Sequence, residues 1–261
     1  MSEPANNISL PDDHVIVLVS KDNGVDAKSH ILNKSVLCAH SVFFAKALKW
    51  KKGQSDKDDA GKLVNIGVFL DKPKLFSVYK SCLTDDVPLE PTAFMPSADD
   101  NDNVNETGGV REPSEEDVAA VGREYEKLAS LYTLADYLID CRLKNKLLQA
   151  TVEAAHATRA NGRTWLPTNG FINEVYARTT EGDKMCKLLV ELCANFADET
   201  WFTEGDKKLL PKDYFSDCCR GLVAKRTRDP LAQSESKTYD YRKFQYKPEE
   251  PKTGQRGWTQ G

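Results

Sequence analysis

A change in the spacing of apolar residues marks the first fifty residues of the chain. Residues 15–19 (Val-Ile-Val-Leu-Val) form a continuous apolar run rich in β-branched side chains, which predicts a strand buried on both faces and therefore central in its sheet. Residues 21–24 (Lys-Asp-Asn-Gly) are typical of a turn, so we expect residues 30–32 to pair back on the first strand as a hairpin.

Helical spacing replaces this pattern directly after the hairpin. Apolar residues recur every three or four positions, at Val36, Leu37, Phe43, Phe44, Ala47 and Leu48, which predicts two short helices joined by a corner. Ser41 is expected to cap the second helix, because a serine hydroxyl accepts a free backbone N–H. The charged segment 49–61 offers no apolar face and is predicted to be a solvated loop.

A third strand and a further helix are predicted next. Residues 63–66 (Leu-Val-Asn-Ile) have the composition of a strand. Pro73 suits the first turn of a helix, and its apolar face would collect Leu75, Phe76, Tyr79 and Leu83. Residues 85–88 (Asp-Asp-Val-Pro) are expected to end that helix.

The composition changes abruptly over residues 90–121. This segment holds nine acidic residues and one basic residue, Arg111, and it cannot bury enough apolar area to offset the entropy of ordering it. We predict a disordered insertion, for which a solvated spacer is favoured over a dock for a basic partner. The insertion has a net charge of −8. Because the whole chain has a net charge of −4, the remaining residues together carry +4.

Helices dominate the remainder of the predicted structure. Apolar periodicity predicts helices over residues 123–139 and from 140 to the Asn161-Gly162 stop. Thr168 and Asp183 are expected to cap two more helices, the second running over 184–197 with an inner face made of Met185, Leu188, Leu189, Leu192 and Phe196. A last helix is predicted from Pro211 to residues 225–226, before a polar tail.

Two stretches resemble the signature of the BTB/POZ domain. Residues 34–44 (Lys-Ser-Val-Leu-Cys-Ala-His-Ser-Val-Phe-Phe) follow the family's order without a gap, with Asn33 where the family usually has a His. Residues 131–139 (Leu-Tyr-Thr-Leu-Ala-Asp-Tyr-Leu-Ile) resemble a helix of the same family. The helices after residue 162 look like the C-terminal extension of fungal BTB proteins.

The resemblance implies an α+β fold, in which a small BTB/POZ sheet flanked by helices is followed by an all-helical extension. We expect a flexible leader over 1–11, the BTB/POZ domain over 12–161 with the disordered insertion at 90–121, the extension over 162–226 and a flexible tail over 227–261. The family also places a short strand after the third helix, here around 87–89.

The resemblance further implies protein partners. BTB domains form homodimers or heterodimers, and many are substrate adaptors that hold a cullin-family scaffold in a ubiquitin ligase. In the family an Asp before the first strand and the basic residue of the signature line the dimer interface; here Lys34 is the base, and His14 occupies the Asp position beside Asp13. The candidate interaction residues are His14, Lys34, Asp85, Asp86, Val87, Arg142 and Lys146.

Composition narrows the location and the chemistry. The chain has no apolar run of about 18 residues and no basic, apolar leader of the secretory type, which predicts an intracellular protein of the cytoplasm or nucleus without a membrane partner. Seven scattered cysteines fit reduced, buried thiols. The spacing of Cys186, Cys193, Cys218 and Cys219 favours core packing over zinc.

Catalytic motifs are missing from the sequence. It contains no Gly-x-Ser-x-Gly elbow and no Gly-rich phosphate loop, and its four histidines lie far apart. We therefore predict a protein that is not an enzyme and that needs no cofactor or metal.

Two functions remain open. The first is a protein–protein interaction module, with the adaptor role that the resemblance implies. The alternative is a nuclear transcriptional or chromatin regulator that oligomerises through the BTB domain. It would contact nucleic acid through a tail in which basic residues alternate with aromatic ones, among them Arg242, Lys243, Phe244 and Tyr246. Acidic residues dilute that tail, so a solvated terminus is favoured and nucleic acid is a less favoured partner.

Overall fold

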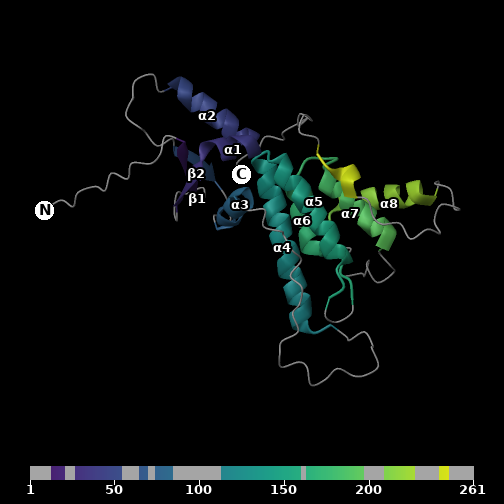
Figure 1. Ribbon diagram of the computed structural model, residues 1–261. Coiled ribbons are helices and arrows are strands. Elements are labelled where there is room, and N and C mark those ends of the chain that lie inside the picture. Colours follow the sequence, from purple (N-terminus) through teal and green to yellow (C-terminus); the bar gives the residue numbers. More distant parts are fainter. Residues whose placement is uncertain are drawn as a thin grey trace. The chain divides into compact units, whose positions relative to one another are not determined.

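The computed structural model describes residues 13–20, 27–54, 65–69, 74–84, 113–159, 163–196, 209–226 and 241–246 (Figure 1). It is a mixed α+β structure in which helices predominate. The chain divides into two compact units, the first comprising Met1–Val87 with Tyr137–Cys141 and the second Pro88–Asp136 with Arg142–Gly261. This division differs from the expected boundary at residue 161, because most of α4 (Glu115–Tyr137) and nearly all of α5 (Cys141–His156) belong to the second unit.

A three-stranded sheet forms the base of the first unit. β1 (His14–Ser20) lies between β2 (Lys28–Asn33), which is antiparallel to it, and β3 (Asn65–Phe69), which is parallel to it. The predicted hairpin and the central place of the first strand are confirmed. Val15, Val17 and Val19 are buried, whereas Ile16 and Leu18 between them are half-buried. The two faces of β1 are therefore unequally covered.

The predicted corner of two helices follows β2. α1 (Lys34–His40) is capped by Asn33, whose Oδ1 accepts a hydrogen bond from the Val36 N–H at 3.1 Å. Ser41 caps α2 (Val42–Gln54) as predicted, accepting from the Phe44 N–H at 3.3 Å and donating to the Leu138 carbonyl at 2.6 Å. The expected loop from residue 49 was wrong for 49–54, which continue α2. A charged segment that has no apolar face can still continue a helix that has already begun, because lysine and glutamine are good helix formers.

α3 (Leu75–Thr84) completes the described part of the first unit. Its Phe76, Tyr79 and Leu83 are buried, as predicted, whereas Leu75 of the same expected face is half-buried. The Tyr79 hydroxyl donates to the Asp140 carboxylate at 3.1 Å, which ties residues 137–141 to this unit. The strand expected around residues 87–89 lies outside the described residues.

The described part of the second unit begins inside the segment expected to be a disordered insertion. α4 starts at Glu115, and Val121 is buried on it. Ser114 and Asp117 cap this start reciprocally: the Asp117 N–H donates to the Ser114 hydroxyl at 3.1 Å, and the Ser114 N–H donates to the Asp117 carboxylate at 2.9 Å. Acidic residues stabilise the first turn of a helix, so the expectation of disorder was wrong for residues 115–121.

The later helices follow the sequence-based expectation closely. They are α6 (Asn169–Arg178), α7 (Lys184–Phe196) and α8 (Lys212–Arg226). Thr168 caps α6, and Asp183 accepts a hydrogen bond from the Met185 N–H at the start of α7. The predicted inner face of α7 is buried except for Phe196, which is 45% exposed. Within the described helices, none is both long and apolar enough to cross a membrane.

The tail contradicts the expectation of a uniformly flexible terminus. A 3-10 helix, η5 (Tyr241–Phe244), forms within it, and Phe244 is buried. We call residues Tyr241–Tyr246 the tail strap.

Candidate functional site

A buried charge cluster lies at the centre of the second unit. Lys144 on α5 is 1% exposed, and its Nζ donates to Asp136 on α4 at 2.7 Å and to Asp183 at 2.8 Å. The Tyr132 hydroxyl donates to the other oxygen of Asp183 at 2.6 Å. A lysine is tolerated inside a protein when it is paired and hydrogen-bonded in this way.

The pairing sets the charge states of the cluster. Burial works to raise the pKa of Asp183, but the Lys144 ammonium and the hydroxyls of Tyr132 and Tyr246 outweigh it and bring this pKa below its ordinary value. Burial likewise works to lower the pKa of Lys144, yet the carboxylates of Asp183 and Asp136 hold it above the ordinary value. The lysine and Asp183 are therefore both charged at neutral pH.

The tail strap is fastened to this cluster by Tyr246. The Tyr246 hydroxyl donates to the Asp183 carboxylate at 2.7 Å and lies 3.0 Å from the Tyr132 hydroxyl. The Lys144 ammonium sits 4.1 Å from the centre of the Tyr246 ring, a cation–π contact. One aromatic side chain thus joins the tail to α4, α5 and the start of α7.

Backbone contacts hold the same end of the strap. The side-chain amide of Asn145 on α5 donates to the Tyr246 carbonyl at 2.9 Å and also accepts a hydrogen bond from the Tyr246 N–H. The Lys184 ammonium donates to the Gln245 carbonyl at 2.6 Å. We call Tyr246 together with its partners Asp183 and Asn145, and with the bond from Lys184 to Gln245, the latch.

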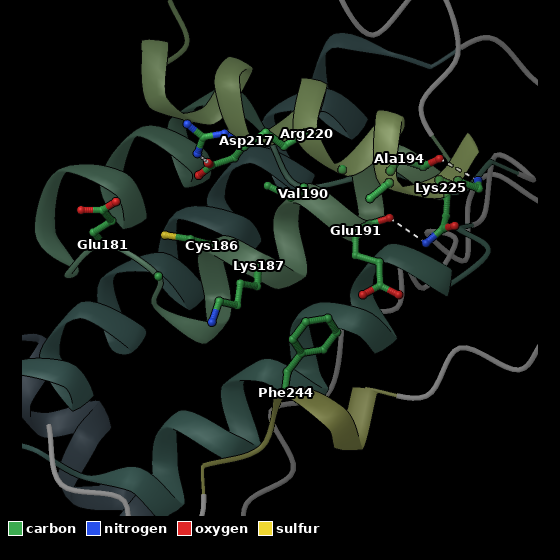
Figure 2. Close-up of a pocket in the computed structure, with 14 residues that line it drawn as sticks. Glu181, Cys186, Lys187, Val190, Glu191, Ala194, Asp217, Arg220, Lys225 and Phe244 are labelled. Carbon is green, nitrogen blue, oxygen red and sulfur yellow. Dashed lines mark hydrogen bonds and ion pairs between the residues drawn. The ribbon is translucent and has the colours of Figure 1, made fainter. Parts of the chain in front are cut away.

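A groove opens between α7, α8 and the tail strap. It encloses about 440 Å³. Its apolar lining comes from Val190, Ala194, Gly221, Ala224 and Phe244, and Figure 2 shows Phe244 pointing from the strap toward α7. α7 and α8 approach closely beneath it, since a Cβ atom built on Gly221 would lie 2.8 Å from Cγ1 of Val190. The volume is sufficient for a large side chain of a bound peptide.

Charged residues of both signs surround this apolar lining. Three are acidic and three are basic: Glu181, Glu191, Asp217, Lys187, Arg220 and Lys225. Most are already held by neighbours, because Arg220 pairs with Asp217 at 3.1 Å and Lys225 donates to the Ala194 carbonyl at 2.8 Å (Figure 2). Glu191 pairs with Lys243 of the strap. The charges of the groove are therefore balanced, and most of them have a partner within the protein.

The cysteines near the groove differ in exposure. All seven in the chain are free thiols, and Cys186, Cys193 and Cys218 are buried. Burial raises the pKa of Cys186, which lines the groove, to about 12, so its thiol is protonated at neutral pH and is a poor nucleophile. Cys219 on α8 is exposed, contrary to the expectation of buried thiols. Within the described ranges, no group of three or more His, Cys, Asp or Glu side chains is arranged to hold a metal ion.

The predicted interaction residues fall on both units. His14 lies in β1, opposite Asn33, and Lys34 begins α1. The Asp13 carboxylate accepts a hydrogen bond from the Asn33 side chain at 2.8 Å. Arg142 is exposed and Lys146 is half-buried on α5. Asp85, Asp86 and Val87 lie outside the described residues.

The groove and the latch lie beyond the sequence-based expectations, which place Phe244 and Tyr246 among candidates for base stacking and do not pair Lys144 with Asp183. The signal was present as a cluster of aromatic residues at 239, 241, 244 and 246 in a mostly polar tail. Such residues are often buried, but nothing in their spacing names the surface that covers them.

Comparisons of the chain with protein-family models, with curated proteins and with solved structures find no match.

Proposed function

We propose that the protein is a protein–protein interaction module whose groove between α7, α8 and the tail strap receives a peptide segment of another protein. The observation that carries this proposal is the groove itself, whose lining combines apolar side chains with charged side chains of both signs. Sites of this shape bind through a few buried apolar anchors, while polar groups at the rim set orientation. The occupant is therefore a peptide that inserts one large apolar side chain.

The charge of the groove favours a peptide over nucleic acid. Its three acids and three bases cancel, whereas a phosphate backbone requires a surplus of basic side chains. The strap aromatics are also engaged: Phe244 is buried, and the Tyr246 ring is in contact with Lys144. These contacts weigh against the alternative of a nuclear regulator that stacks bases on its tail.

The first unit supports the BTB/POZ part of the proposal through its order of elements. A hairpin, a capped pair of helices, a parallel third strand and a further helix follow one another as the resemblance implies. On this proposal the unit meets a scaffold, a cullin-family protein in the adaptor case, and a pull-down with a purified cullin tests that case. Self-association through a pocket at Lys34 has less support, because the Asp13 carboxylate is bound to Asn33.

A pair of neighbouring substitutions tests the groove. Ala224 lines it, whereas Val223 is 61% exposed on α8 and is not part of the lining. A random peptide library displayed on phage is selected on the full chain, and each selected peptide is then measured against Ala224→Arg and Val223→Arg. We expect peptides with a large apolar residue that keep their affinity for Val223→Arg and lose about tenfold or more against Ala224→Arg.

Equal binding of the selected peptides to all three proteins would contradict the proposal. So would failure of the library to yield any peptide that Ala224→Arg weakens. Circular dichroism of both variants checks that the arginine has not disturbed the helices.

A further inference from the structure

The tail strap contributes Phe244 to the lining of the groove. Phe244 contributes apolar lining, and Lys243 pairs with Glu191 of α7 on the rim. The other lining residues belong to α7, α8 and the turn before α7. Without the strap, the remaining surface would be a shallow face of two helices and would lack the ring of Phe244.

The strap is held by the latch together with the buried ring of Phe244 and the ion pair between Lys243 and Glu191. Tyr246 and Gln245 together contact Asp183, Asn145 and Lys184. In the sequence, residues 227–240 separate the strap from α8, so docking of the strap has a chain-closure entropy that its contacts must offset. The contacts of the latch lie on α4, α5 and the start of α7, beside the groove lining and separate from it.

From this arrangement we infer that the tail strap is a detachable wall of the groove, and that peptide binding and closure of the latch are coupled. This inference rests on the proposed function of the groove. A peptide that contacts Phe244 binds the docked form better than the released form, so it must draw the strap toward docking. The coupling is reciprocal. Opening the latch lowers the affinity for the peptide by the same factor by which the bound peptide raises the equilibrium constant for docking of the strap.

The test uses the full chain and the peptide selected on it. Tyr246→Phe removes the hydroxyl that bonds to Asp183 and keeps the ring over Lys144. Tyr241→Phe removes a hydroxyl from the other end of the strap and is the matched control. Hydrogen exchange followed by mass spectrometry reports docking of residues 241–246, and fluorescence polarisation of the labelled peptide reports its affinity.

We expect Tyr246→Phe to exchange faster across the strap and to bind the peptide about three- to tenfold more weakly, while Tyr241→Phe stays close to the wild type. In the wild type, added peptide is expected to slow exchange in the strap. Phe244→Ala, which removes the apolar contribution of the strap to the groove and also a buried contact of the strap, is a second variant: it should weaken the peptide and also raise exchange in the strap.

Two results would overturn the inference. One is a strap whose exchange is unchanged by the peptide and by Tyr246→Phe. The other is a looser strap in Tyr246→Phe with unchanged peptide affinity. In either case the proposed function still stands if a selected peptide binds Ala224→Arg more weakly than Val223→Arg. Failure of this inference can therefore be told apart from failure of the proposed function.

Discussion

At the scale of single residues, Lys144 decides how the second unit is held together. A buried ammonium is costly unless its charge is matched, and here Asp136 and Asp183 each accept one of its hydrogen bonds. The rings of Tyr132 and Tyr246 also lie near it, with centres 4.8 and 4.1 Å from Nζ. Removing the lysine alone would leave two carboxylates facing each other without their cation.

We therefore predict that Lys144→Met lowers the free energy of unfolding by about 3–5 kcal/mol, the cost of breaking a buried ion pair from one side. Urea denaturation measures it. Lys127→Met, at an exposed position on α4, is the control and should change stability by less than about 0.5 kcal/mol. Equal losses in the two variants would mean that the cluster contributes nothing specific.

At the scale of elements, the groove depends on how closely α7 and α8 pack. Glycine within a helix costs stability relative to alanine, yet Gly221 stands in the middle of α8. A Cβ atom there would lie 2.8 Å from Cγ1 of Val190, a branched side chain with little freedom to move. The glycine lets the two helices meet beneath the groove.

Gly221→Ala is accordingly predicted to destabilise the protein by about 1–3 kcal/mol through overpacking. Thermal unfolding followed by circular dichroism is the measurement. Gly122→Ala on α4 is the matched control, because a Cβ atom at Gly122 would meet nothing within 4 Å. There the better helix former should raise stability by up to about 1 kcal/mol, and a stabilising Gly221→Ala would show that the two helices do not need this close approach.

At the scale of the whole molecule, the latch ties stability to pH through Asp183. Its pKa in the folded protein lies below the ordinary value of 3.8, because the bonds from Lys144, Tyr132 and Tyr246 outweigh its burial. A carboxyl with a lowered pKa stabilises the fold fully above its unfolded pKa, and that contribution is lost as the pH falls through the folded pKa.

We predict that the wild type loses stability below about pH 4 more steeply than Asp183→Asn, which has no carboxyl to protonate at this position. Urea denaturation at a series of pH values compares the two proteins. Between pH 5 and 8 the difference between the two unfolding free energies should be constant. Parallel curves down to the lowest pH would show that Asp183 titrates alike in the folded and unfolded chain.

Local patterns predicted much of what is local. The hairpin, the caps at Ser41, Thr168 and Asp183, and the start and end of α8 all match the sequence-based expectation. Each depends on residues a few positions apart, whose preferences tertiary contacts did not override. The errors lie where composition was used as a substitute for contact, at residues 49–54, at 115–121 and in the tail strap.

The amino-acid sequence by itself determined most of the described elements and their order, because hydrophobic spacing and capping act over single turns of the chain. Only the tertiary structure decided that Lys144 meets Asp183 and that Tyr246 returns to both. Lys144 and Asp183 are 39 positions apart in the sequence, and Asp183 and Tyr246 are 63 positions apart. At such separations the pairing depends on which surfaces the folded helices leave uncovered, which no local pattern specifies. The groove exists for the same reason, as the space that α7 and α8 leave and the strap encloses.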